Sequence, residues 1–345
     1  MSAEVLVTGG TGFLGRQILG ALHRAGVPAA ALVREPKGGP IAQWSAEVGA
    51  VSLVPGEVNQ PTAWQAHPAL AKVRTIIHSA AIVIHGRPAD PQLAEVNVAG
   101  TLNVVRAAAA LGARVIFVST SGTVGCYRHA DLRADEHAPF AEATVGRWPY
   151  YASKIQAERE SRRLAEKLGV PFTVARPPVL LGPDDHRGRS TEHVARVLDG
   201  RIPFVPEGGM HFTDVRDLAA ALVVLAHRET WRPTYHFPGH ESPLGAFFQQ
   251  VAEVGGLHLD RPTAPGWLLK GLARGTDKLA RLPRYQRPRW LPDPVVLEMA
   301  AHHWGLSSLW TEAELGYRAR PARQTLADTI HWLRQQPAGA RKRAH

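Results

Sequence analysis

The chain has 345 residues, of which 45% are hydrophobic and 20% are charged, and this balance predicts a packed globular protein rather than a disordered one. Its formal net charge is +10, but most of the chain shows no dense block of like charge, so we expect no nucleic-acid partner. No apolar run reaches the roughly 18–20 residues of a membrane-spanning helix, and the single cysteine, Cys126, excludes an internal disulfide. Because the N-terminus opens directly into a strand pattern, we expect no signal peptide and a cytoplasmic protein.

Short apolar runs alternate with helix-like segments through the first half of the chain. The predicted strands are residues 5–7, 29–33, 51–54, 75–78, 115–118 and 172–175, and the predicted helices between them are residues 15–25, 97–111 and 151–168. Strands and helices that alternate in this way form right-handed crossovers and a parallel sheet covered on both faces. The sequence therefore predicts an α/β fold, a Rossmann-type doubly wound parallel sheet, with a smaller C-terminal lobe.

The pattern changes after Arg176, where paired prolines and a Gly-Pro step interrupt it. We expect residues 1–176 to form the Rossmann domain, residues 177–335 to form mainly a substrate-binding lobe, and residues 336–345 to be a basic tail. Residues 211–237 are expected to return to the first domain as one more strand and helix. The stretch 262–294 predicts a loop-laden, partly helical region, and a helix is predicted again over residues 325–335.

A glycine-rich turn follows the first predicted strand, with Gly9, Gly12 and Gly15 at every third residue. Glycines at this place let the chain turn tightly, let a pyrophosphate approach the backbone, and let the helix pack close to the sheet. The free N–H groups of the helix N-terminus then face the phosphates. An ordinary glycine-rich turn is the alternative. We expect nucleotide contacts from Gly9, Thr11, Gly12, Phe13, Leu14 and Gly15.

The second predicted strand ends in Arg34, at the position where NAD-using proteins usually carry an acidic residue that holds the ribose hydroxyls. A guanidinium suits the 2′-phosphate of NADP(H), which a carboxylate would repel. Arg34 therefore favours NADP(H) over NAD(H). The alternative is a surface arginine on a loop, and the adjacent Glu35 is acidic.

Tyr150 and Lys154 lie four residues apart at the start of a predicted helix, so they share one of its faces. A phenol ordinarily has a pKa near ~10, and a nearby ammonium favours the phenolate, which makes proton exchange feasible near neutral pH. The fifth predicted strand ends in Ser119-Thr120-Ser121, at the edge where ligands bind in parallel sheets. We expect Ser121 to donate a hydrogen bond to a substrate carbonyl and Tyr150 to supply the proton, while at least one of the three hydroxyls only caps the turn.

In order and spacing these motifs resemble the short-chain dehydrogenase/reductase superfamily in its extended branch, the NAD-dependent epimerase/dehydratase superfamily. The resemblance spans nearly the whole chain, and within that branch it is greatest to the dihydroflavonol reductases and 3β-hydroxysteroid dehydrogenases. It rests on the glycine turn, on Ser121, Tyr150 and Lys154, and on segments 77–81, 97–103, 175–183, 212–219 and 312–317.

The resemblance implies roles for further residues. Asn97 begins the segment whose Asn supports the proton relay in many members, and Lys154 also contacts the nicotinamide ribose. Ala80 belongs to the segment on the adenine-ribose side, and Pro177 to the segment that passes the nicotinamide. After the third strand the family usually has an Asp that contacts adenine. Here Glu57 and Val58 stand at that place, a departure that weakens the adenine assignment.

The resemblance implies an NADPH-dependent oxidoreductase that reduces a ketone or aldehyde of a hydrophobic substrate, or oxidises the matching alcohol. Two alternatives stay open: a nucleotide-sugar epimerase or dehydratase with tightly bound NAD, and a non-catalytic NADP-binding regulatory protein. The Trp- and Leu-rich part of the lobe predicts either an apolar lid, with peripheral contact to a membrane surface, or a small satellite core. The histidines lack metal-ligand spacing, so no metal site is expected, and relatives commonly form homodimers.

Overall fold

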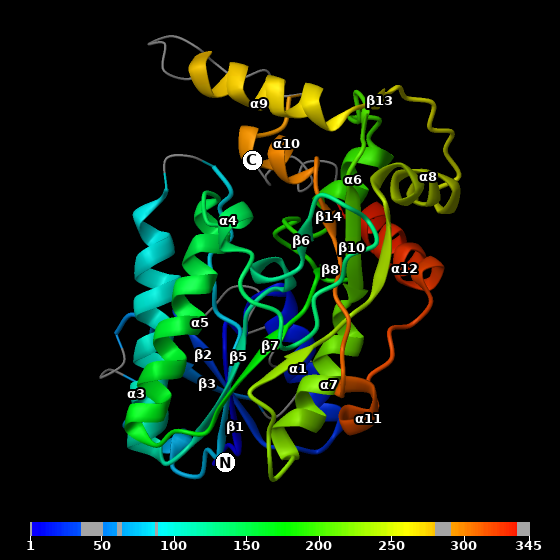
Figure 1. Cartoon of the computed structure of the whole chain (residues 1–345). Helices are drawn as coiled ribbons and strands as arrows, with labels where there is room; N and C mark the ends of the chain where they lie inside the picture. The colour runs from blue at the N-terminus through cyan, green and yellow to red at the C-terminus, as the bar shows by residue number, and fades with distance from the viewer. Residues whose placement is uncertain (1, 36–50, 61–63, 87–88, 280–290, 337–345) are drawn as a thin grey trace.

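The computed structural model describes residues 2–35, 51–60, 64–86, 89–279 and 291–336, and a seven-stranded parallel sheet runs through its centre (Figure 1). The strand order is β11-β7-β5-β4-β1-β2-β3, and it changes direction between β1 and β4. Such a switch point opens a crevice at the carboxyl ends of the strands, where nucleotides bind. The strands are β1 (Val5–Thr8), β2 (Ala29–Val33), β3 (Val51–Pro55), β4 (Thr75–His78), β5 (Arg114–Val118), β7 (Phe172–Arg176) and β11 (Thr234–His236).

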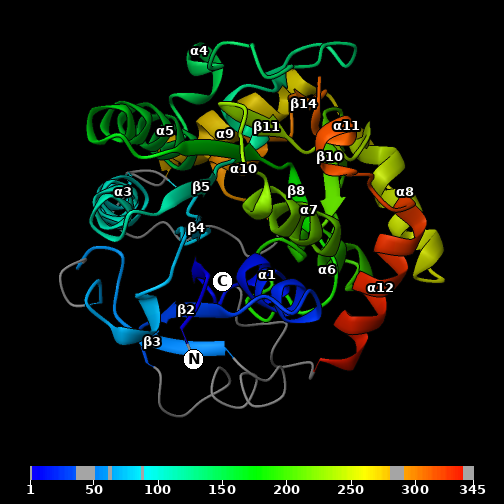
Figure 2. The same ribbon diagram turned by 90° about the horizontal axis from the view of Figure 1, so that it is seen from below.

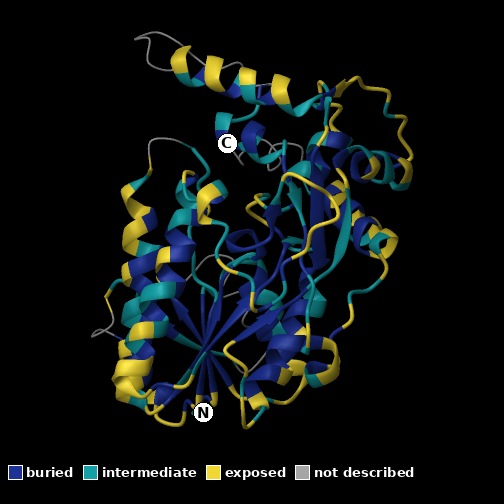
Figure 3. Cartoon of the chain, in the orientation of Figure 1, coloured by how far each residue is buried: buried dark blue, intermediate teal, exposed yellow. Residues whose placement is uncertain are grey.

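Helices cover both faces of this sheet (Figures 1 and 2). On one face lie α1 (Phe13–Arg24) and α7 (Val215–His227), and on the other lie α3 (Gly100–Leu111) and α5 (Pro149–Leu168). Every residue of β1, β2 and β4 is buried, which explains their continuous apolar sequence (Figure 3). The six predicted strands are found, and the predicted Rossmann-type α/β class is confirmed.

The helix predicted over residues 97–111 consists of two segments. A π-helical turn, η3 (Leu93–Ala99), comes first and contains Asn97, and α3 follows it without a break. Helix α5 begins two residues before the predicted start, with Pro149 in its first turn. Proline is favoured there because its fixed φ suits the helix and its missing N–H is not needed. Tyr150 and Lys154 consequently both lie inside α5.

The C-terminal part of the chain builds a second, three-stranded sheet, β12-β10-β8, from β8 (Val179–Leu181), β10 (Gly209–Asp214) and β12 (His240–Pro243). Helices α6 (Glu192–Leu198), α8 (Leu244–Val254) and α12 (Ala322–Gln335) share its core, which includes Phe212 and Phe247. Within residues 211–237, β10 pairs with β8 and β12 rather than with the first sheet, and it buries Phe212 in the second core. Helix α7 and β11 do reach the central sheet, and the division into domains stays a prediction.

The remaining elements are short except for α9, which lies at the top of Figure 1. The inner side of α9 buries Leu269, whereas its Trp267 is 74% exposed, so peripheral membrane contact stays a prediction. Residues 337–345 of the predicted basic tail lie outside the described residues. In the described part of the chain no helix combines the length and apolar character needed to cross a bilayer. The remaining elements of the fold, α9 among them, have these bounds: η2 (Pro68–Leu70), η4 (Ser121–Thr123), β6 (Cys126–Tyr127), α4 (Glu142–Val145), β9 (Val205–Pro206), β13 (Thr263–Ala264), α9 (Gly266–Leu279), α10 (Pro294–Met299), β14 (His303–Trp304) and α11 (Thr311–Leu315).

Candidate active site

The glycine turn between β1 and α1 is built so that larger residues do not fit at two of its positions. Gly9 has φ +72°, and a Cβ on it would lie 2.7 Å from the backbone N of Ala80. A Cβ on Gly15 would lie 2.1 Å from the backbone O of Gly9. The missing side chains let the turn lie against the segment after β4 and let the start of α1 come close to Gly9.

Gly12 stands at the N-cap of α1 and borders open space. A Cβ there would meet only the backbone O of Gly9, at 3.1 Å, and no side chain caps the first turn of the helix. The first-turn N–H groups, at Phe13 and Leu14 among others, therefore have no helical partner. An uncapped helix N-terminus beside open space fits the pyrophosphate of a dinucleotide.

The other residues expected to bind nucleotide follow strands of the central sheet, all at its carboxyl edge. Arg34 follows β2 and is exposed, Ala80 follows β4, and Pro177 follows β7. Val58, after β3, is 8% exposed and packs against Gly100, while the carbonyl of Glu57 accepts a hydrogen bond from Trp64 Nε1 at 3.0 Å. Their contacts with a nucleotide stay predictions.

Lys154 is buried at the centre of the expected catalytic group. Its Nζ donates a 2.8 Å hydrogen bond to the carbonyl of Val118, at the end of β5, and lies 4.3 Å from the centre of the Phe117 ring. Burial lowers the pKa of Lys154 to about 7, although the negative charge of Glu158 opposes that shift. An amine with a pKa near neutrality can gain or lose a proton at physiological pH.

Tyr150 differs from the expectation made for its phenol. Burial raises its pKa above the ordinary value, whereas the sequence predicted that the Lys154 ammonium would lower it. The reason is that desolvation of the phenol dominates, while the Lys154 ammonium is held by the Val118 carbonyl. Tyr150 is thus a protonated phenol at neutral pH, the form that a proton donor requires.

Asn97 connects the π-helical turn to α5. Its side chain accepts a hydrogen bond from Ile82 N at 2.8 Å and donates to Ile82 O at 2.9 Å and to Ser153 Oγ at 3.0 Å. Ser153 in turn donates to the carbonyl of Tyr150 at 2.6 Å. Asn97 therefore fixes the start of α5 relative to the segment after β4, which is a positioning role.

The three hydroxyl residues after β5 have separate tasks. Thr120 Oγ1 accepts a hydrogen bond from Gly122 N at 3.3 Å and caps η4, and Ser119 donates to the buried carboxylate of Glu158. Ser121 lines a cavity, and no partner of its hydroxyl lies in the part of the chain that the structure describes. Of the three hydroxyls, that of Ser121 is thus the one left open toward the cavity, and its contact with a substrate stays a prediction.

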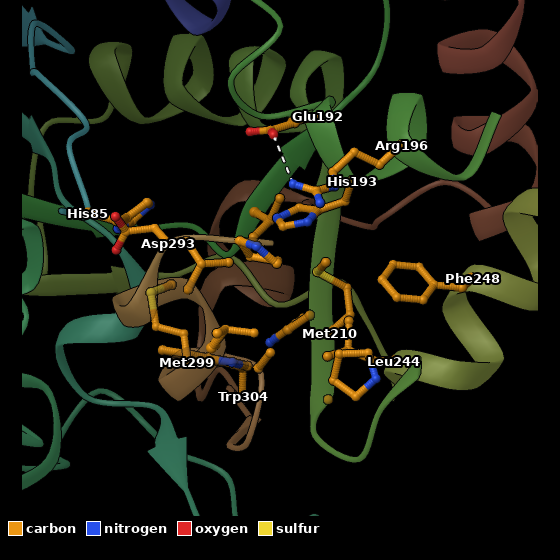
Figure 4. Close-up of a pocket in the computed structure, with 18 of the residues that line it drawn as sticks. His85, Glu192, His193, Arg196, Met210, Leu244, Phe248, Asp293, Met299 and Trp304 are labelled. Carbon is orange, nitrogen blue, oxygen red and sulfur yellow. Dashed lines mark ion pairs between the residues drawn. The ribbon is translucent and has the colours of Figure 1, made fainter. Parts of the chain in front are cut away.

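The cavity has a volume of about 410 Å³ and lies between the carboxyl edge of the central sheet and the C-terminal lobe (Figure 4). Ser121 and Tyr151 line it from the first sheet's side. Tyr150 is a direct neighbour of this wall, since its ring centre lies 5.2 Å from that of Tyr151. The opposite walls are mostly apolar and include Phe204, Met210, Leu244, Phe248, Met299 and Trp304. A hydrophobic molecule can therefore reach Ser121.

Comparison with known proteins places the chain in a family. The model of the NAD dependent epimerase/dehydratase family matches residues 5–235. The chain belongs to this family. Cinnamoyl-CoA reductase 1 of Oryza sativa subsp. japonica is 32% identical over 243 residues, covering 67% of this chain and 70% of the relative. The Stigmatella aurantiaca 4-hydroxy-2-methyl-3-oxo-4-farnesyl-3,4-dihydroquinoline-1-oxide ketoreductase is 28% identical over 342 residues, 95% of each chain.

A solved structure agrees with this assignment. The crystal structure of gox2253 is 28% identical, has a TM-score of 0.81, and covers 97% of this chain and 98% of its own. The resemblance to the extended dehydrogenase/reductase branch is confirmed, and this epimerase/dehydratase family protein is an NAD(P)-dependent oxidoreductase.

Sequence reasoning missed one buried ion pair of this family member. Glu158 is fully buried, and it accepts hydrogen bonds from Arg176 Nη2 at 2.6 Å and from Thr123 Oγ1 at 3.2 Å. These bonds tie α5 to β7 and to the segment that carries Ser121. The sequence did contain a sign of this role, because Tyr150, Lys154 and Glu158 are spaced four residues apart and so lie on one helix face.

Several polar cavity residues of the enzyme were also missed. His85 stacks edge-on against Tyr150, with ring centres 5.5 Å apart, and lies next to Asp293 in Figure 4. Burial, followed by the charge of His193, lowers the pKa of His85 to about 4, so its ring is neutral at pH 7. Across the described residues, no group of three or more His, Cys, Asp or Glu side chains is arranged to hold a metal ion.

Proposed function

We propose that the protein is an NADPH-dependent reductase that acts on a ketone or aldehyde of a hydrophobic substrate, or oxidises the matching alcohol in the reverse direction. One observation carries the proposal: Ser121, whose hydroxyl has no partner among the described residues, lines a cavity with mostly apolar opposite walls, and Tyr150 packs against Tyr151 of the same wall. A carbonyl is the polar group that such an end can receive while the rest of the molecule stays in apolar surroundings.

When bound, the nicotinamide supplies a hydride to the carbonyl carbon. Ser121 donates a hydrogen bond to the carbonyl oxygen, which gains negative charge as the hydride adds. Tyr150 donates its phenolic proton to that oxygen, so the product is an alcohol. Lys154, whose pKa burial lowers to about 7, offers a proton to restore the phenol. Asn97 and Glu158 hold α5 and the Ser121 segment in place.

Arg34 supports the preference for NADPH. It follows β2 at the crevice edge, is exposed, and has no carboxylate within ion-pair distance among the described residues. Its guanidinium is therefore available for the 2′-phosphate, for which bidentate hydrogen bonds suit arginine. The name of the Stigmatella aurantiaca relative, a ketoreductase of a farnesyl-bearing compound, supports a hydrophobic carbonyl substrate.

The test begins with nucleotide choice. We expect purified protein to retain no nucleotide and to bind NADPH more tightly than NADH when either is titrated by nicotinamide fluorescence. Arg34→Asp should weaken NADPH binding far more than NADH binding, and equal losses would exclude the 2′-phosphate role. Tightly retained NAD would favour an epimerase or dehydratase that keeps its nucleotide through turnover.

The substrate class is tested next by comparing hydrophobic carbonyl compounds with nucleotide sugars. We expect NADPH oxidation with hydrophobic cyclic ketones or aryl aldehydes, and none with nucleotide sugars. Wild type and Ser121→Ala are compared at matched protein concentrations. Because Ser121 contacts the carbonyl oxygen, its loss should lower kcat by roughly 100-fold and leave the Kd for NADPH unchanged. Unchanged kcat would place the carbonyl elsewhere.

A further inference from the structure

A chain of hydrogen bonds between buried polar side chains links the glycine turn to the start of α5. Thr8 ends β1 and His78 ends β4, and the two residues are paired in the sheet at the point where the strand order switches. Thr101 lies at the start of α3, Asn97 in η3 and Ser153 in α5. All five side chains are buried. The chain therefore runs from the side of the sheet expected to hold the nucleotide to the helix that carries the expected catalytic residues.

The direction of each hydrogen bond around His78 follows from the groups at its ends. Thr101 Oγ1 donates to the carbonyl of Asn97 at 2.6 Å, so its oxygen accepts from His78 Nε2 at 3.0 Å. Burial lowers the pKa of His78 to about 3, so the ring is neutral and its lone pair is on Nδ1. That nitrogen accepts from Thr8 Oγ1 at 2.6 Å, and Thr8 Oγ1 accepts from the backbone N of Ala80 at 3.4 Å. With these directions both hydroxyls and both ring nitrogens have a partner, which fixes His78 as the tautomer with its proton on Nε2.

One end of the chain holds the glycine turn. Gly9 follows Thr8 directly and packs against Ala80, since a Cβ on Gly9 would lie 2.7 Å from the backbone N of Ala80. The hydroxyl of Thr8 is bonded to that same backbone N, and Ser79 Oγ donates to the carbonyl of Thr8 at 2.8 Å. The position of the turn relative to β4 therefore depends on the Thr8 hydroxyl and on the ring that accepts its proton.

The other end of the chain holds the start of α5. Asn97 Nδ2 donates to Ser153 Oγ at 3.0 Å, and Ser153 Oγ donates to the carbonyl of Tyr150 at 2.6 Å. The carbonyl of Asn97, in the same π-helical turn, is the group that Thr101 binds. Such π-helical turns are frequent at functional sites. His78 is thus connected through hydrogen bonds to the backbone of the expected proton donor.

We propose that His78 is a positioning residue of this enzyme, which holds the glycine turn and Tyr150 in one fixed relation. A nucleotide bound at the turn then presents its nicotinamide to a proton donor whose place is already set. The inference rests on the proposed function, which assigns the nucleotide to the turn and the proton transfer to Tyr150. Holding reacting groups in a fixed geometry lowers the entropic cost of bringing them together.

The first test exchanges the hydroxyl of Thr8 in the full chain and measures the Kd of NADPH and of NADH by nicotinamide fluorescence. Thr8→Val keeps the shape of the side chain and removes the hydroxyl, whereas Thr8→Ser keeps the hydroxyl and removes a methyl group. We expect Thr8→Val to raise both Kd values about 10-fold, the effect of one hydrogen bond, and Thr8→Ser to change them less than about 2-fold. A role in packing alone predicts the reverse order, because only serine leaves a cavity.

The second test addresses the catalytic end with the cyclic ketone or aryl aldehyde that the wild type reduces best. Thr101→Val should lower kcat about 10-fold and leave both nucleotide Kd values unchanged, while Thr101→Ser should resemble the wild type. His78→Phe should show both defects, and His78→Gln should recover part of each, because an amide can donate and accept. Thr173→Val is the matched control: it removes a buried hydroxyl that donates to the carbonyl of Arg232, and it should change neither kcat nor Kd.

A third measurement reads the tautomer directly by ¹⁵N NMR of histidine-labelled protein at pH 7. The signal of His78, assigned by its loss in His78→Phe or His78→Gln, should be that of a neutral ring with its proton on Nε2. A proton on Nδ1 would contradict the chain, and nucleotide binding that is weaker in Thr8→Ser than in Thr8→Val would overturn the positioning role. A wild type that reduces no carbonyl compound would overturn the proposed function instead, and the Kd values and the tautomer would still decide the role of His78 at the turn.

Discussion

Lys154→Met removes an amine that the folded protein buries almost completely, and the pH dependence of stability reports on its charge. Lys154 is 2% exposed, and burial lowers its pKa from 10.5 to about 7. The unfolded chain keeps the proton up to the ordinary pKa. Between about pH 7 and 10.5, unfolding therefore takes up a proton that the folded state lacks, so raising the pH through this window stabilises the folded wild type. Methionine has no such proton, and the variant shows no such gain.

The magnitude follows from the pKa difference. Between pH 7 and pH 9, the free energy of unfolding of the wild type should rise by about 2 kcal/mol relative to that of Lys154→Met. Urea unfolding without nucleotide, followed by tryptophan fluorescence at pH 7, 8 and 9, measures this difference. Lys278→Met, on the exposed side of α9, is the matched control, and its difference from wild type should stay constant. A constant difference for Lys154→Met would refute the reasoning, because Lys154 would then keep its proton when folded.

Three further variants test the site and its support. Tyr150→Phe should lower kcat by at least about 100-fold while the Kd for NADPH is unchanged, and retained activity would mean a different proton donor. Gly12→Val should raise the Kd of both NADPH and NADH more than about 10-fold, since its side chain fills the open space before α1; unaltered affinity would refute the phosphate turn. Glu158→Leu should lower the free energy of unfolding in urea by about 3–5 kcal/mol because it leaves Arg176 buried without its carboxylate, whereas Glu142→Leu, on the surface, should lower it far less; similar losses would contradict the role of burial.

The sequence predicted six strands of the central sheet because a strand that is buried on both faces has apolar residues at nearly every position. Strands such as β1 and β4 are apolar at nearly every residue, and the turns between them carry glycine at positions that only glycine can occupy. The glycine turn can also be predicted from the sequence, because a Cβ on Gly15 would clash with the backbone of Gly9 and only glycine fits there. In these cases the physical cause acts within a few residues of the chain.

The strand β10 and the cavity wall were not predictable in this way. Nothing local distinguishes β10 from a strand of the central sheet, because its pairing with β8 and β12 depends on which edge is already taken by β11. The cavity brings Ser121 near Phe248 and Trp304, which come from distant segments. Their meeting depends on how the lobe packs, and no spacing in the sequence records that. The prediction that Lys154 lowers the pKa of Tyr150 was wrong for a similar reason, because the raising effect of burial depends on the packing of the whole site.

The cavity wall has a consequence for how this protein can change. Residues that would meet the hydrophobic part of a substrate, such as Leu244, Phe248 and Met299, lie on α8 and α10, whereas the proposed hydrogen-bond and proton donors lie on η4 and α5. Substitutions in the first group can therefore alter which compound is accepted without disturbing the reaction itself. A library restricted to α8 and α10 samples new specificities at little risk to turnover, and divergence among relatives can proceed along the same route.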